Sequence, residues 1–108
     1  YNRSFNNVME IQGEGHVLGF VKDISPYITV KKVKLNPGDI MVAVTDGILD
    51  SKSLRGEPFG KDRVQKSIAE NTISTAQNMT QSTYDSLVNF LSKELDDDVS
   101  IFTLKLLK

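Results

Sequence analysis

The stretch "MVAVTDGILD", residues 41–50, decides the fold because it joins an apolar strand to a carboxylate and a glycine. Residues 41–45 carry no formal charge and stand directly before Asp46-Gly47. Residues 40–44 are apolar at every position, which is typical of a strand that is covered on both faces. We therefore expect an inner strand of a sandwich that ends at Asp46.

A proline-glycine turn precedes this strand. In Asn36-Pro37-Gly38-Asp39, proline fixes φ at the second position and glycine accepts the positive φ of the third, as a type II turn requires. Residues 27–35 alternate loosely, so the sequence predicts an antiparallel hairpin between residues 27–35 and 40–44. The first of these stretches carries three lysines, which indicate an exposed sheet edge or, alternatively, an anion-binding patch: Lys31, Lys32 and Lys34.

Two other stretches are predicted to be strands, residues 7–11 and residues 99–107. The final strand alternates between two faces, with Val99, Ile101 and Thr103 on one and Phe102, Leu104 and Leu106 on the other. A glycine-rich turn at residues 13–15 and an apolar stretch at residues 16–21 follow the first strand.

Two helices are expected between residue 61 and the last strand, after a surface loop at residues 50–60. The first spans residues 61–70, with Val64, Ile68 and Ala69 on its apolar face. The second begins at a capping box formed by Ser74 and Gln77. Its core-facing positions recur at helical spacing: Ala76, Met79, Thr83, Leu87, Leu91 and Leu95, widened by Tyr84, Val88 and Phe90.

Composition limits the possible functions. With 108 residues the chain has room for a single core, and because it starts without methionine in a polar segment we expect a partial domain, residues 1–108. A net charge of -1 gives no reason to expect nucleic acid or an anionic membrane as a partner. The absence of cysteine excludes thiolate zinc sites and cysteine nucleophiles within this stretch and fits the cytoplasm. No apolar run reaches the roughly 20 residues that span a bilayer.

Carboxylates stand at two strand junctions. Asp46 follows the apolar strand, and Asp96, Asp97 and Asp98 precede the last one. If the two strands are antiparallel neighbours, these carboxylates meet at one edge of the sheet, where a hard cation such as Mg²⁺ or Mn²⁺ would offset their repulsion. The alternative is that Asp46 is an ordinary turn residue and that the acidic run is solvated.

Four short motifs in this order resemble the bacterial sporulation-type (SpoIIE/RsbU-like) branch of the metal-dependent PP2C/PPM protein phosphatases. They are Pro37-Gly38-Asp39, Thr45-Asp46-Gly47, Glu57-Pro58-Phe59-Gly60 and Asp97-Asp98-Val99-Ser100. The resemblance covers roughly residues 15 to 107 and corresponds to the C-terminal half of that domain. It implies an α+β fold, the C-terminal part of an α/β/β/α sandwich, with antiparallel strands and two helices on one face.

By this resemblance Asp46 and Asp97 match metal ligands of a two-metal site for Mn²⁺ or Mg²⁺. Gly47 would let the backbone turn away beside the metal, and Asp98 would support the loop. The family's remaining ligands lie in an N-terminal half that this chain does not contain. His16, the only histidine, is assigned no role in the site.

The resemblance implies hydrolysis of phosphoserine or phosphothreonine in a phosphorylated protein, often a small anti-anti-sigma regulator. Two ions roughly 3.5–4 Å apart would activate a water and neutralise the phosphoryl oxygens. We expect this chain to be inactive alone, to associate with the upstream half and sensor domains, and to have exposed sheet edges that favour a homodimer. The alternative is a non-catalytic pseudo-phosphatase that serves as an interaction or regulatory module.

Overall fold

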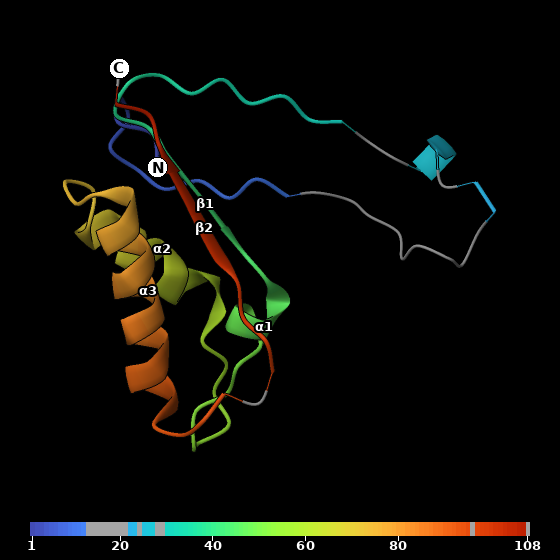
Figure 1. Ribbon diagram of the computed structural model, residues 1–108, viewed down its shortest axis with the longest axis vertical. Helices are drawn as coiled ribbons and strands as arrows, with labels where there is room; N and C mark the ends of the chain where they lie inside the picture. The colour runs from blue at the N-terminus through green and yellow to red at the C-terminus, as the bar shows by residue number, and fades with distance from the viewer. Residues whose placement is uncertain (13–21, 24, 28–29, 96, 108) are drawn as a thin grey trace.

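The computed structural model describes residues 1–12, 22–23, 25–27, 30–95 and 97–107. Its elements, in chain order, are η1 (Ser25–Tyr27), β1 (Ile40–Val44), α1 (Asp46–Leu49), α2 (Gly60–Glu70), α3 (Ala76–Leu91) and β2 (Ile101–Lys105). Helices and antiparallel strands occur together, which confirms the predicted α+β class (Figure 1). None of the helices in these ranges is long and apolar enough to cross a membrane.

β1 and β2 form an antiparallel pair in which Ile40 lies opposite Lys105 and Val44 lies opposite Ile101. Two strands more than 50 residues apart in sequence therefore run side by side, and α2 and α3 lie on one side of them (Figure 1). The predicted antiparallel neighbours and the predicted two helices on one face are both confirmed. The pairing brings the end of β1 beside the start of β2.

Hydrogen bonds fix α3 and the segment before it on β2. The hydroxyls of Thr80 and Thr103 lie 2.7 Å apart, and the Lys105 ammonium donates to the carbonyls of Thr72 and Ser74 at 3.0 and 2.8 Å. Thr103 and Lys105 belong to the helix-facing side of β2, as the predicted alternation requires. The side chains that point the other way, Phe102 and Leu104, are 58% and 42% exposed.

The core lies between the helices and the helix-facing side of the sheet. It consists of Ile40, Ile48, Phe59, Val64, Ile68, Met79, Leu87 and Leu91. One hydrogen bond crosses it: the hydroxyls of Ser67 and Thr83 lie 3.1 Å apart, and the Thr83 hydroxyl also donates to the Met79 carbonyl. A buried hydroxyl pair therefore joins α2 to α3 without leaving a polar atom unsatisfied.

The predicted helices are confirmed, with four corrections. Tyr84 and Val88, expected to widen the core-facing stripe of α3, are each 38% exposed. The N-cap of α3 is Thr75, one residue later than the expected Ser74, because the Thr75 hydroxyl accepts the Asn78 N–H at 3.1 Å. α3 ends at Leu91, where Ser92 adopts φ 53°, so Leu95 lies beyond the helix and is only half-buried. Ala69 on α2 is exposed and does not belong to the apolar face.

The expectation that β1 is covered on both faces is wrong for the structure described. Ile40 is buried, but Ala43 is exposed and Met41 is half-buried. Met41 and Ala43 lie opposite Leu104 and Phe102, so the same side of both strands lacks a cover. The apolar side chains on this side of the sheet suit a surface that a second layer of the protein would cover.

The predicted N-terminal strand and hairpin are also wrong. Residues 8–12 form no strand, and the pairing nearby is a single bridge between Asn2 and Asn7. Residues 30–35 form no strand either, and the strand that pairs with β1 is β2. A strand needs a neighbour for its backbone hydrogen bonds, and neither segment finds one. The glycine-rich turn and the apolar stretch at residues 13–21 lie outside the described residues.

The turn before β1 is confirmed. Gly38 has φ +91°, and the Asp39 N–H donates to the Asn36 carbonyl at 2.9 Å. The buried Asp39 carboxylate accepts the backbone N–H groups of Arg3 and Asn36 at 2.9 and 2.8 Å. These two hydrogen bonds hold the pKa of Asp39 below its usual value, and the bond from the Arg3 N–H has the larger effect.

The loop at residues 50–60 is exposed at Leu54 but buries Phe59, which is only 1% exposed. The Phe59 ring contacts Phe90 edge-on at 5.5 Å between centroids. Arg63 lies 4.1 Å above the centre of the Phe90 ring and donates to the Phe59 carbonyl at 3.0 Å. The sequence interpretation of this loop as purely a surface segment therefore missed a core residue.

Candidate functional site

The site begins where β1 and β2 are joined beyond their last paired residues. The Thr45 N–H donates to the Ser100 carbonyl at 3.2 Å, and the Ser100 N–H donates to the Thr45 hydroxyl at 3.1 Å. Thr45 is the first polar residue after five apolar ones, so its hydroxyl is available at the strand end. These two bonds bring the residues after β1 beside the residues before β2.

Gly47 fits against the main chain of the opposite segment. A Cβ atom on Gly47 would collide with the carbonyl oxygen of Asp98, and it would lie 3.5 Å from a methyl group of Val99. Gly47 does not have a positive φ, so the glycine is required by close approach rather than by backbone conformation. Its own carbonyl accepts a hydrogen bond from the Ser51 hydroxyl.

Asp46 lies between Thr45 and Gly47 and is the first residue of α1. Its side chain is exposed, and in the described part of the chain its carboxylate takes part in no hydrogen bond or ion pair. Only its main-chain carbonyl is engaged, by the N–H of Asp50 at 2.8 Å. A carboxylate without a protein partner at a fixed position is free to bind a cation.

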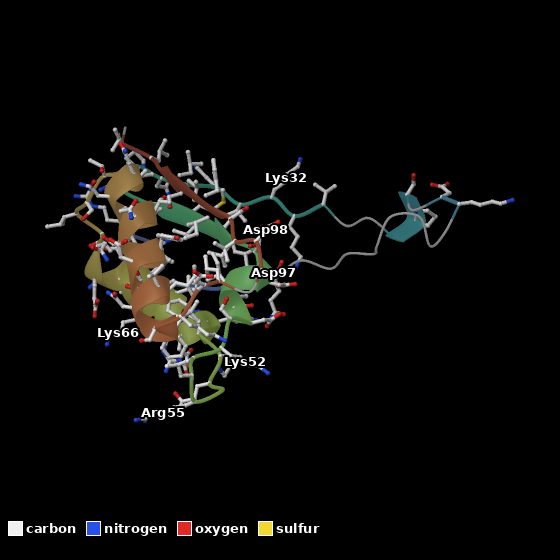
Figure 2. All side chains as sticks on the ribbon, turned by 60° about the horizontal axis from the view of Figure 1, so that its bottom comes forward. Lys32, Lys52, Arg55, Lys66, Asp97 and Asp98 are labelled. Carbon is white, nitrogen blue, oxygen red and sulfur yellow. The ribbon has the colours of Figure 1, made fainter. Side chains whose placement is uncertain are left out.

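Asp97 and Asp98 lie at the end of β2 that faces α1 (Figure 2). Both side chains are exposed. One Asp97 oxygen accepts the Asp98 N–H at 2.8 Å, which leaves its other oxygen free. The structure therefore brings Asp46, Gly47, Asp97 and Asp98 to one end of the sheet, as the sequence predicted from antiparallel strands. Asp96 and His16 lie outside the described residues.

The donor chemistry at this end fits part of a site for a hard cation. Mg²⁺ and Mn²⁺ prefer carboxylate oxygens and retain several waters, and Asp46 and Asp97 are exposed carboxylates with oxygens free. Within the described ranges, no group of three or more histidine, cysteine or acidic residues is placed to hold a metal ion. The described residues therefore do not make up a complete metal site by themselves.

Sequence reasoning gave no role to two residues that shape the site, Thr45 and Ser51. Thr45 joins the two strand ends, and Ser51 binds the Gly47 carbonyl and receives the Phe59 N–H on its own carbonyl at 2.8 Å. The signal for Thr45 was present, because a hydroxyl directly after an apolar strand can accept a hydrogen bond from a neighbouring strand. No sequence signal distinguishes Ser51 from the other serines of the loop.

Comparison with known proteins identifies the family to which the chain belongs. The sequence model of the family described as Stage II sporulation protein E (SpoIIE) matches residues 1–107. "Phosphoserine phosphatase RsbU" of Bacillus subtilis (strain 168) is 30% identical over 105 residues, which cover 97% of this chain and 30% of that relative. The chain thus spans less than a third of the length of RsbU. No solved structure gives a significant match. The family match extends over nearly all of the chain and confirms the resemblance in the motifs: the chain belongs to the SpoIIE family of PP2C-like phosphatase domains.

Proposed function

We propose that residues 1–108 are one partial domain, the C-terminal portion of a metal-dependent protein serine/threonine phosphatase. In this proposal Asp46 and Asp97 are ligands of a two-metal site for Mn²⁺ or Mg²⁺, completed by residues outside the chain. The observation that carries it is the antiparallel pairing of β1 and β2, by which two exposed aspartates 51 positions apart in sequence come to one end of a sheet. The SpoIIE family match supports the reaction class.

Each residue at this end has a physical role in the proposal. Metal ions, when bound, supply an activated water and neutralise phosphoryl charge. The Asp46 and Asp97 carboxylates supply oxygen ligands from opposite strands, and Thr45 keeps those strands joined. Gly47 allows the two segments to approach, and the Asp98 N–H supports the loop by donating to the Asp97 carboxylate. The absence of cysteine in the chain is consistent with hydrolysis that needs no thiol nucleophile.

The exposed side of the sheet supports the partial-domain assignment. Phe102 and Leu104, 58% and 42% exposed, lie beside Met41 and Ala43 on the side away from α2 and α3. We assign this apolar side to contact with a second sheet supplied by the upstream half, giving the α/β/β/α sandwich of the family. Without that half the two-metal site is incomplete, so the chain alone is inactive.

The substrate class follows from the relative. RsbU carries the printed name phosphoserine phosphatase. We propose a phosphorylated protein as the substrate, a serine- or threonine-phosphorylated regulator of the anti-anti-sigma type, in the cytoplasm. Sensor domains in the longer protein and a homodimer are further partners in this proposal. A non-catalytic interaction module remains the second candidate, favoured by the presence of only two candidate ligands at the described site.

Phosphatase activity of the full-length protein with a phosphoserine peptide, measured with Mn²⁺ and with a chelator, tests the assignment. We expect Mn²⁺-dependent hydrolysis that Asp46→Asn and Asp97→Asn each abolish. Asp62→Asn is the matched control, since Asp62 is an exposed aspartate in the first turn of α2. A full-length protein that hydrolyses nothing, and whose Tm does not respond to Mn²⁺, would favour the non-catalytic module.

A further inference from the structure

The edge of β1 that faces away from β2 has unused backbone groups. Backbone groups of a strand alternate between its two sides, and those of Asp39 and Thr45 bond to the β2 side through Leu106 and Ser100. The N–H and C=O groups of Val42 and Val44 therefore point to the opposite edge. In the described ranges no backbone group pairs with either valine on that edge.

Tyr1 already occupies the first position on this edge. The Ile40 N–H donates to the Tyr1 carbonyl at 3.0 Å, and the Tyr1 nitrogen donates to the Ile40 carbonyl at 2.6 Å. The following residues run against the direction of β1, because the Arg3 N–H reaches the Asp39 carboxylate and the Arg3 side chain lies over Gly38. Tyr1 and Ile40 are thus a hydrogen-bonded pair of an antiparallel ladder.

A groove of about 680 Å³ continues this edge past Ile40. β1 forms one wall, and residues 8–11 with residues 31 and 33–35 form another. Val64 and Ile68 of α2 contribute apolar surface, and the Lys61 ammonium binds Glu10 at 2.5 Å, which ties the second wall to α2. Unpaired strand groups and apolar side chains lie together along the groove, as the binding of an extended segment requires.

We propose that the polypeptide directly upstream of Tyr1 in the longer protein lies in this groove as a third strand, antiparallel to β1. The Tyr1–Ile40 pair sets the register: the residue just before Tyr1 lies opposite Met41, the third before it opposite Ala43, and the fourth before it opposite Val44. The strand starts at the Asp46 end of the sheet and ends at Tyr1. This inference rests on the proposed function in requiring the longer domain.

The upstream segment is favoured over a second copy because it is joined to a residue that is already paired. Both backbone groups of Tyr1 are hydrogen-bonded to Ile40, so the preceding residues are held next to the unpaired edge at high effective concentration. A segment from another molecule would have to compete with that tethered strand. Because residues 1–3 run antiparallel to β1, the residues before Tyr1 extend toward Val44.

Disulfide cross-linking of the full-length protein tests the register. Ala43 is exposed, and in the proposed ladder it forms a pair without mutual hydrogen bonds, with a Cα separation of roughly 4.5 Å that suits a disulfide. Ala43→Cys is combined with a cysteine at the third residue before Tyr1, in a background without other cysteines. The matched control places the second cysteine one residue closer to Tyr1, where its side chain points to the opposite face.

The proposal expects an intramolecular disulfide, seen as a mobility shift under non-reducing conditions, for the first pair and not for the control. It also expects slow hydrogen exchange at the Val42 and Val44 amides. A disulfide that links two molecules, a control that cross-links equally well, or fast exchange at both amides would overturn it. A cross-linked protein without Mn²⁺-dependent activity rejects the proposed function alone, whereas an active phosphatase that does not cross-link rejects only the third strand.

Discussion

The carbonyl oxygen of Asp98 occupies the space that a side chain on Gly47 would need. Gly47 follows the first candidate metal ligand, and Asp98 follows the second. The contact between their main chains therefore sets how closely the two aspartates approach. The closeness of the Asp98 carbonyl requires a glycine at position 47. The backbone conformation does not require one, because the φ of Gly47 is one that other residues can adopt.

Replacing Gly47 by alanine is expected to destabilise the full-length protein by about 1–3 kcal/mol, the range for overpacking at a close contact. The added methyl would collide with backbone, which cannot move away as a flexible side chain can. Chemical denaturation without metal measures the change. Asp98→Ala is the control: it keeps the carbonyl, so its effect should stay within about 0.5 kcal/mol. Equal stability of Gly47→Ala and wild type would show that the two segments are farther apart.

The lowered pKa of Asp39 predicts that the stability of the protein depends on pH. The N–H groups of Arg3 and Asn36 lower the pKa of Asp39 in the folded state below the ordinary value of 3.8. The free energy of unfolding should therefore contain an Asp39 contribution that is complete above pH 3.8 and is lost as the pH falls through the lowered folded-state pKa. Denaturation of wild type and Asp39→Asn at a series of acidic pH values measures it. The difference between the two should shrink on acidification, and a constant difference would contradict the assignment.

The cap of α3 can be located by two alanine substitutions. Thr75→Ala should cost about 1 kcal/mol, because it removes the acceptor for the Asn78 N–H. Ser74→Ala should have an effect smaller than about 0.5 kcal/mol, since the contact of Ser74 with Lys105 uses its carbonyl. Thermal denaturation of both variants decides between them. A larger loss for Ser74→Ala would restore the capping box expected from the sequence.

Phe59 and Leu54 belong to the same loop but differ in burial, 1% against 74% exposed. Phe59→Ala should destabilise the protein by about 3–5 kcal/mol, through the cavity it leaves beside Phe90. Leu54→Ala should change the free energy of unfolding by less than about 0.5 kcal/mol. Urea denaturation at equilibrium compares the two. Similar losses would mean that the loop does not enter the core.

Much of the site could be predicted from the sequence because it depends on local patterns. The apolar run before Asp46 and the alternating run after Asp98 indicated two strands, and their antiparallel pairing placed the aspartates at one end. The type II turn at residues 36–39 followed from proline and glycine alone. The ligand roles of Asp46 and Asp97 stay predictions, because they came from the family motif.

The errors concern features that depend on distant partners. Residues 7–11 and 30–35 have strand-like patterns, but a pattern does not supply the neighbouring strand whose hydrogen bonds it needs. Likewise, the apolar character of β1 indicated two covered faces, whereas the described chain covers one. Phe59 was missed because its neighbours are typical of a turn, and its burial is decided by Phe90 on another helix.

Calorimetric titration of the full-length protein with Mn²⁺ tests the central claim most directly, because it depends on neither substrate nor turnover. The account predicts saturable binding that Asp46→Asn and Asp97→Asn each weaken by at least about tenfold, while Asp62→Asn leaves it unchanged. Binding that is indifferent to Asp46 and Asp97, or no binding by the wild-type protein, would contradict the assignment of this end of the sheet as part of a metal site.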